Sequence, residues 1–180
     1  MSVLETRAYA KLNLSLDVLD RRSDGYHEMR MVMQTVTLSD ALRLETGTGK
    51  PLSMRSSVGC LPAAAGNRAA AAALRLCAET GADCGGLSIE LDKSIPVCAG
   101  LAGGSADAAA VLRGLNRLLG LGLPPERLEA IGARVGSDVP YCVRGGTALA
   151  EGRGEVLTTL PALPDCHVVL CKPAFSVPTP

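Results

Sequence analysis

Aromatic residues are nearly missing from this chain of 180 residues, which has no Trp, one Phe and three Tyr. Proteins that bind single-stranded nucleic acid stack the bases on aromatic side chains, so a partner of that class is not expected. The chain also has no excess of positive or negative charge, because 18 Lys and Arg residues balance 18 Asp and Glu residues. A partner selected by overall charge, such as duplex nucleic acid or an anionic membrane, is therefore not expected either.

Histidine is scarce, and the cysteines are not spaced as metal ligands. The chain has two His and seven Cys residues, and no two cysteines form a Cys-x-x-Cys pair. This pattern supports neither a zinc cluster nor a disulfide framework, and it favours reduced thiols. The N-terminal stretch lacks the basic-then-apolar order of a signal peptide, and no apolar run reaches transmembrane length. A cytoplasmic protein without a membrane partner is predicted.

A period of two in the first part of the chain predicts a β-hairpin. Between residues 8 and 18 apolar and polar side chains alternate, with Lys11 and Asn13 on the polar side. This alternation is typical of a strand with one buried face. Asp24-Gly25 is a turn signal, and an extended pattern resumes after it. We therefore expect two strands joined by a polar tip.

Helical patterns follow, so the predicted fold class is α+β. Asn67 is an expected N-cap for an alanine-rich helix that Gly81 ends. Two further helices are predicted, ending at Gly120 and Gly136. The strands occur as antiparallel-looking hairpins with helices between them. The rest is predicted as a turn and hairpin at 137–160 and a buried strand at 166–173.

The stretch IPVCAGLAGGSADAAA, residues 95–110, places several glycines directly before a predicted helix. Glycines let the backbone approach a ligand closely, and the N–H groups and dipole of a helix start favour an anion. No lysine precedes Ser105 as in a Walker A loop, and the helix leads to another helix, unlike a dinucleotide-binding unit. A packing turn accounts for one or two glycines only, so phosphate binding is the favoured interpretation.

This stretch resembles the Pro-x-x-x-Gly-Leu-Gly/Ala-Gly-Ser-Ser/Ala loop of the GHMP small-molecule kinases, named for galactokinase, homoserine, mevalonate and phosphomevalonate kinases. The segments AKLNLSLDVLDRRSDGYHEM and GSDVPYCVRGGTALAEGRGE are similar to those of family members that act on a cytidine diphosphate-linked methylerythritol. The resemblance implies a GHMP N-terminal domain with an antiparallel-rich sheet and packed helices. Such a domain is similar to the second domain of ribosomal protein S5.

The resemblance also implies a reaction. ATP with Mg²⁺ would donate its γ-phosphoryl group to the 2-hydroxyl group of that substrate, in the non-mevalonate route to isoprenoid precursors. No metal-binding residues are assigned. Another GHMP kinase acting on a different alcohol, and a nucleotide-binding domain without catalysis, stay open as alternatives. A homodimer stays open as the oligomeric state.

Specific site residues follow from the family motifs. Asp138 would accept the proton of the attacking hydroxyl group from an extended backbone, and Lys11 would orient that group and offset phosphoryl charge. Taken singly, each would be an ordinary turn or surface residue. The implied substrate contacts are Asn13 at the methylerythritol end, Tyr26 and His27 at cytosine, and Thr179. The implied ATP contacts are Asn67, Lys93, Pro96, Gly100, Leu101, Ala102, Gly103, Gly104, Ser105 and Ala106, the last in place of a second serine.

The expected domain organisation follows the same resemblance. Residues 1–165 would form the N-terminal ATP-binding and catalytic domain, and residues 166–180 would begin a C-terminal domain whose remainder this sequence lacks. Because one wall of the cleft would then be missing, weak or no turnover is expected of the 180-residue chain.

Overall fold

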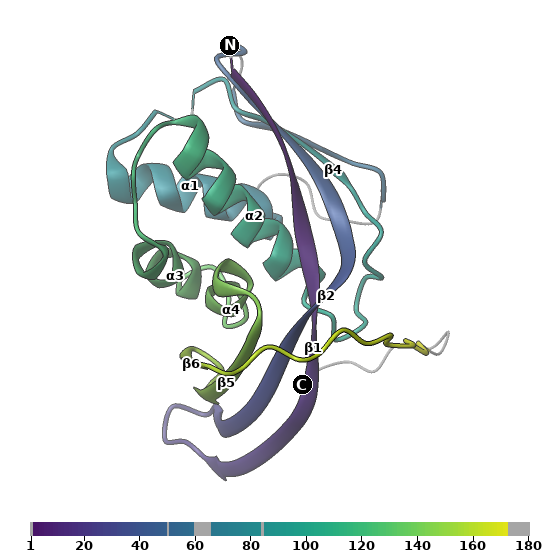
Figure 1. Ribbon diagram of the computed structural model, residues 1–180. Coiled ribbons are helices and arrows are strands. Elements are labelled where there is room, and N and C mark those ends of the chain that lie inside the picture. Colours follow the sequence, from purple (N-terminus) through teal and green to yellow (C-terminus); the bar gives the residue numbers. More distant parts are fainter. Residues whose placement is uncertain (1, 50, 60–65, 84, 173–180) are drawn as a thin grey trace.

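The computed structural model describes residues 2–49, 51–59, 66–83 and 85–172. In that part of the chain six strands form one mostly antiparallel sheet, and four helices are stacked on one side of it (Figure 1). This arrangement confirms the predicted α+β class. None of the described helices is long and apolar enough to cross a membrane.

The second strand organises the sheet. The strands are β1 (Ser2–Arg21), β2 (His27–Thr46), β3 (Ser53–Ser56), β4 (Ser88–Asp92), β5 (Thr147–Gly152) and β6 (Val156–Thr159). β1 pairs antiparallel along nearly the whole of β2, as the predicted hairpin requires. On the other side of β2, β4 pairs with its C-terminal half and β5 with its N-terminal half. β3 joins β4 in parallel, and β6 joins β5 antiparallel.

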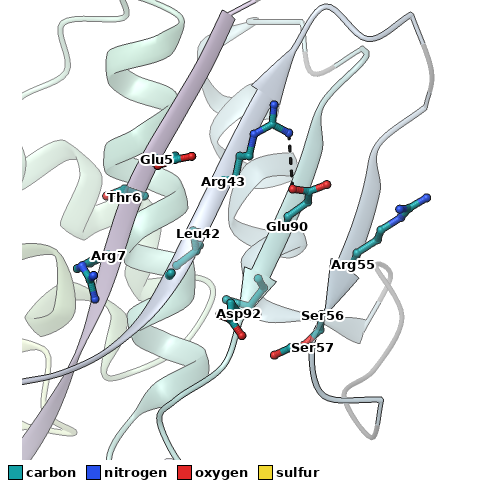
Figure 2. Close-up of a pocket in the computed structure, with 12 residues that line it drawn as sticks. Glu5, Thr6, Arg7, Leu42, Arg43, Arg55, Ser56, Ser57, Glu90 and Asp92 are labelled. Atoms are coloured by element: carbon teal, nitrogen blue, oxygen red, sulfur yellow. Dashed lines mark ion pairs between the residues drawn. The ribbon is translucent and has the colours of Figure 1, made fainter.

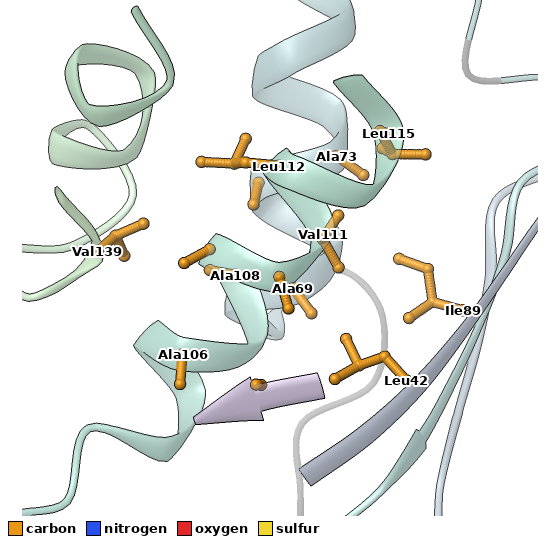
Figure 3. Packing of buried hydrophobic residues seen from close by; sticks show 14 of the residues in the cluster. Leu42, Ala69, Ala73, Ile89, Ala106, Ala108, Val111, Leu112, Leu115 and Val139 are labelled. Carbon is orange, nitrogen blue, oxygen red and sulfur yellow. The ribbon is translucent and has the colours of Figure 1, made fainter. Parts of the chain in front are cut away.

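Small side chains let the helices pack closely on the sheet and on each other. The helices are α1 (Arg68–Thr80), α2 (Gly103–Leu118), α3 (Pro125–Ala133) and α4 (Val139–Arg144). Ala69 of α1 and Ala108 of α2 are fully buried in one core with Leu42 and Ile89 of the sheet (Figure 3). A side chain at Gly114 of α2 would collide with Leu44 of β2. Glycine at this position therefore permits the close approach of α2 to the sheet.

The first helix begins and ends as the sequence predicts. The Asn67 side-chain oxygen accepts a hydrogen bond from the backbone N–H of Ala69 at 2.9 Å. Gly81 is left-handed, with φ 72°, and donates its backbone N–H to the carbonyl of Cys77. Both caps are confirmed, so the two ends of α1 follow from local residue chemistry.

Three expectations about other segments are wrong. Residues 139–144 form the helix α4, although a turn was predicted there; Pro140 lies in its first turn, where proline is tolerated. Residues 166–172 are exposed and lie in no strand of the described chain, so the predicted buried strand is not formed there. Reduced thiols were expected, and Cys98, Cys142, Cys166 and Cys171 are indeed free, but Cys77 is disulfide-bonded.

Candidate functional site

The glycine-rich stretch forms the connection from β4 to α2. Cys98, Gly100 and Ala102 have positive φ values of 55°, 72° and 56°. Ala102 is at the N-cap position of α2 and makes no side-chain capping bond. The helix therefore presents the backbone N–H groups of its first turn, at Gly103 and Gly104, without a side-chain partner. An open helix start of this kind can accept an anion.

Packing below the loop favours glycine at the first residue of α2. A β-carbon at Gly103 would lie 3.1 Å from Cγ2 of Ile95 and 3.2 Å from Nζ of Lys93. These distances are tighter than ordinary contacts, so with a side chain here Ile95 or Lys93 would have to shift by a few tenths of an ångström. The loop therefore rests directly on the Lys93 ammonium group.

Lys93 forms ion pairs with two buried carboxylates. Its Nζ contacts Asp40 Oδ2 and lies 2.8 Å from Asp107 Oδ2, and all three side chains are at most 4% exposed. Asp40 also accepts hydrogen bonds from the backbone N–H groups of Ser94 at 2.6 Å and Ile95 at 2.7 Å. This geometry favours a supporting role for Lys93 beneath the loop over the predicted direct contact with ATP.

One carboxylate of this cluster is incompletely satisfied. Asp107 Oδ1 is buried and has no hydrogen-bond partner within the described chain. Burial raises the pKa of Asp107 to about 7, the ion pair with Lys93 opposes that rise, and the charge of Asp40 adds to it. A buried carboxyl group with a pKa of about 7 changes its charge in the physiological pH range.

Lys11 points into the protein, although alternation places it on the polar face of the first strand. The pairing of β1 with β2 is irregular between Tyr9 and Lys11 and again between Asn13 and Ser15. Such irregularities redirect side chains, and Lys11 is only 5% exposed. Its backbone N–H donates to the carbonyl of Leu101 at 3.2 Å, and its Nζ donates to Asn13 Oδ1 at 2.9 Å. Lys11 and Asn13 thus lie together beside the loop.

Asp138 lies at the start of α4. Its backbone is helical, with φ −84° and ψ −10°, so the predicted extended conformation is wrong. Cys142, one turn further on, lies near both candidate catalytic charges: burial raises the pKa of its thiol to about 12, Asp138 adds to the rise, and Lys11 opposes it. α4 contacts β1, so Lys11 and Asp138 belong to neighbouring elements, and the raised pKa favours the protonated, unreactive thiol of Cys142.

An arginine of α2 fixes this region. Arg113 Nη1 donates to the backbone carbonyls of Cys142 at 2.5 Å and Val143 at 3.3 Å. These carbonyls are in α4, where unpaired acceptors and the negative dipole end favour a cation. The short helix that begins after Asp138 is therefore held against α2.

The predicted cytosine residues lie far from Lys11. Tyr26 and His27 are exposed at the tip of the β1–β2 hairpin, and the guanidinium of Arg153 lies 5.0 Å from the Tyr26 ring centre. Asn13 pairs with Met33, six residues along β2 from His27, which corresponds to roughly 20 Å of strand. Only an extended ligand could reach both places.

The remaining predicted contacts divide by exposure. Pro96, Gly100 and Gly104 are exposed, and Ala102 and Gly103 are partly exposed. The side chains that face inward belong to Asn67, Leu101, Ser105 and Ala106. Thr179 lies outside the described residues.

Sequence reasoning missed Arg68. Its Nη1 donates to Ser105 Oγ at 2.9 Å, so this arginine covers the buried loop serine from the side of α1. No motif marks the residue, because only the packing of α1 on α2 brings it to the loop.

A hollow of about 630 Å³ lies elsewhere, on the face of the sheet opposite the helices (Figure 2). Arg43 in this hollow lies 2.9 Å from Glu45 and 3.6 Å from Glu90, so its charge is already compensated. The hollow does not include the glycine loop or either candidate catalytic residue. We therefore take the loop, and not the hollow, as the candidate site.

A protein-held metal is not supported by the donor atoms. In the ranges that the structure describes, no three His, Cys, Asp or Glu side chains gather in a way that could hold a metal ion. Magnesium that accompanies ATP is bound largely by phosphate oxygens and water, and so needs few protein ligands.

Comparisons with known proteins agree with this geometry. Residues 67–146, which include the glycine loop and Asp138, match the model of the GHMP kinases N terminal domain. The chain is 50% identical over 176 residues to the 4-diphosphocytidyl-2-C-methyl-D-erythritol kinase of Geobacillus sp. strain WCH70, covering 98% of this chain and 61% of that protein. It is 45% identical over 179 residues to the kinase of that name from Lachnospira eligens, covering 99% and 62%.

Solved structures show the same relationship. A crystal structure of 4-(cytidine 5'-diphospho)-2C-methyl-D-erythritol kinase matches with a TM-score of 0.76 and 39% identity, over 89% of this chain and 56% of that one. Homoserine kinase from Cytophaga hutchinsonii matches with a TM-score of 0.66 and 23% identity, over 87% and 52%, and shares the fold alone. The chain spans about three fifths of the length of the curated relatives that it matches.

Proposed function

This chain is a homologue of the N-terminal part of 4-diphosphocytidyl-2-C-methyl-D-erythritol kinases, and from that premise we propose that it forms the nucleotide-binding and catalytic domain of such a kinase. The domain would extend to about residue 165. ATP would donate its γ-phosphoryl group to the 2-hydroxyl group of 4-diphosphocytidyl-2-C-methyl-D-erythritol. The cytoplasm would be the place of this reaction.

The observation that carries the proposal is the meeting of three segments at one helix start. The open first turn of α2 offers N–H groups to phosphates, and the carbonyl of Leu101 in its loop accepts a hydrogen bond from Lys11 of β1. Asp138, at the start of α4, lies near the same Cys142 thiol as Lys11. A phosphate donor on the loop would therefore face a cation and a carboxylate from two other elements.

The proposed reaction assigns one step to each group. Asp138 accepts the proton of the substrate 2-hydroxyl group while the oxygen of that hydroxyl group forms a bond to the γ-phosphorus of ATP. The bond from that phosphorus to the bridging oxygen breaks, and ADP leaves. Lys11 orients the hydroxyl group and offsets the charge on the transferred phosphoryl group, while the first-turn N–H groups hold the phosphates. Mg²⁺ would neutralise phosphate charge when it is bound.

The distance along the hairpin supports an extended acceptor. Tyr26 and His27 are six strand residues beyond the level of Asn13, so a small alcohol at Lys11 could not touch them. A cytidine diphosphate joined to a polyol could place its polyol at Asn13 and its base at the hairpin tip. The Tyr26 ring would offer a face for stacking.

The test is a turnover assay on a set of alcohols. Purified protein is incubated with ATP and either the cytidyl substrate, homoserine or mevalonate, and the phosphorylated product is identified by mass spectrometry. We expect product from the cytidyl substrate alone, at the weak turnover expected of the 180-residue chain. Asp138→Asn should lower kcat about 10²- to 10⁴-fold with little change in nucleotide affinity. Asp92→Asn, an exposed change at the end of β4, is the control and should leave kcat unchanged.

Other outcomes separate the alternatives. Product from homoserine or mevalonate alone would indicate a different GHMP kinase. Nucleotide binding with no product from any alcohol would indicate a nucleotide-binding domain without catalysis.

A further inference from the structure

Arg68 connects two of the segments that form the candidate site. Besides its 2.9 Å hydrogen bond to Ser105 Oγ, its Cδ lies 3.7 Å from the place that a β-carbon of Gly104 would occupy. Its Nη1 and Cζ lie 3.7 and 3.8 Å from the corresponding place at Gly136. The guanidinium therefore lies between the start of α2 and the segment that leads to Asp138.

The charge of this arginine is not compensated. Among the residues that the structure describes, the Ser105 hydroxyl group is the hydrogen-bonding partner of the guanidinium, and no carboxylate lies at ion-pair distance. Some arginines of the chain do have such partners, since Arg144 lies 2.7 Å from Glu129 and Arg127 lies 3.0 Å from Glu79. Arg68 is also exposed, so a dissolved anion can reach it.

The position of the charge is unfavourable for the ligand-free protein. Arg68 is the first residue of α1, and its partner Ser105 is in the first turn of α2. Both helix starts carry the positive end of a dipole, which disfavours a nearby cation. A side chain that breaks a local rule in this way is expected at a functional position, where a ligand supplies the missing charge.

We propose that Arg68 binds the terminal phosphoryl group of the nucleoside triphosphate, as a residue of the phosphate site that no motif marks. This inference rests on the proposed function. The group to be transferred must lie between the glycine loop and Asp138, and the guanidinium lies between those two segments. A planar guanidinium can donate two hydrogen bonds to phosphate oxygens and can stabilise the charge of the transferred group. The loop has no Walker lysine, and Arg68 of α1 would supply a cation there in addition to Lys11.

The experiment compares two nucleotides and three variants. Calorimetric titrations with ADP and with the β,γ-methylene analogue of ATP are made on the wild-type protein, Arg68→Gln, Arg68→Lys and Arg75→Gln. Arg75 is exposed two turns further along the same face of α1 and is the matched control. We expect Arg68→Gln to lower the affinity for the triphosphate analogue about 10- to 100-fold and the affinity for ADP less than about threefold. Arg68→Lys should recover part of the loss, and Arg75→Gln should leave both affinities unchanged.

Thermal unfolding without nucleotide gives an independent readout. Because an uncompensated cation is removed from two helix starts, Arg68→Gln should leave the melting temperature equal or raise it. A lowered melting temperature together with an equal loss of affinity for both nucleotides would show that Arg68 has a structural role and would overturn the inference. Unchanged affinity for the triphosphate would overturn it as well, even while wild-type binding upheld the proposed function. If the wild-type protein bound neither nucleotide, the proposed function itself would fail.

Discussion

The buried cluster beneath the glycine loop contains two carboxylates and one ammonium group, and so has an excess negative charge when Asp107 is ionised. Lys93 contacts both Asp40 and Asp107, while Asp107 Oδ1 has no partner within the described chain. Removal of a charge from water is costly unless it is fully paired. Protonation of Asp107 relieves that cost, so the cluster should respond to pH.

The stability of the protein should therefore depend on pH through Asp107. The pKa of this group is raised from 3.8 to about 7 by burial. A carboxyl group whose pKa is raised by folding stabilises the folded state fully below its unfolded pKa, and that contribution is lost as pH rises through the folded value. Relative to Asp107→Asn, the wild-type free energy of unfolding should fall by up to about 4 kcal/mol between pH 3.8 and about 7.

Urea denaturation of both proteins across this pH window measures the difference. Asp92→Asn, which changes an exposed aspartate near the cluster, is the control and should show no such trend. A difference between wild type and Asp107→Asn that stays constant with pH would contradict this account of the cluster.

Some residues of the candidate site can be predicted from the sequence, and others cannot. Alternation correctly predicts the first strand, but it cannot show the pairing irregularities that turn Lys11 inward. The glycine loop could be predicted because its chemistry is contained in consecutive residues. Arg68 could not, because its place beside Ser105 depends on how α1 packs on α2.

The start of α1 is stabilised by its N-cap residue, Asn67. Asn67→Ala should lower the free energy of unfolding by about 1 kcal/mol, because the N–H of Ala69 loses its capping acceptor. Asn67→Ser retains an acceptor and should be near the wild type. Thermal or urea unfolding of the two variants provides the measurement. Equal losses in both variants would show that capping is not the stabilising role of Asn67.

Elements with weak local signals were predicted wrongly. The helix α4 has six residues and a proline in its first turn, so its sequence is compatible with a turn as well. Residues 166–172 have the apolar composition of a buried strand, yet Val169 is 92% exposed. A composition of this kind requires a neighbouring strand, and the sequence does not say whether one is present.

At the scale of the whole molecule, the lower half of the β1–β2 hairpin extends away from the helices (Figure 1). Here β1 exposes four large apolar side chains at 45–57%, namely Leu14, Leu16, Val18 and Leu19. The predicted buried face of this strand is thus buried at Ala8 and Ala10, half-buried at Leu12 and exposed from Leu14 onward. Neighbouring exposed apolar side chains favour association.

We expect the protein to self-associate through these exposed apolar side chains. The double variant Leu16→Ser, Val18→Ser should show less concentration-dependent association than the wild type in static light scattering. Val156→Ser removes an apolar side chain of β6 that is 55% exposed, and serves as the control that should behave like the wild type. A wild-type protein that stays monomeric at every concentration would refute the prediction.

A nuclear magnetic resonance titration tests whether the start of α2 binds the phosphates of ATP. Backbone amide signals are followed while a non-hydrolysable ATP analogue is added to the isotope-labelled protein. The amides of Gly103 and Gly104 should show the largest shifts, because their N–H groups would donate to phosphate oxygens. Shifts confined to the sheet hollow around Arg43 and Glu90, or no shifts at saturating nucleotide, would contradict phosphate binding at the start of α2.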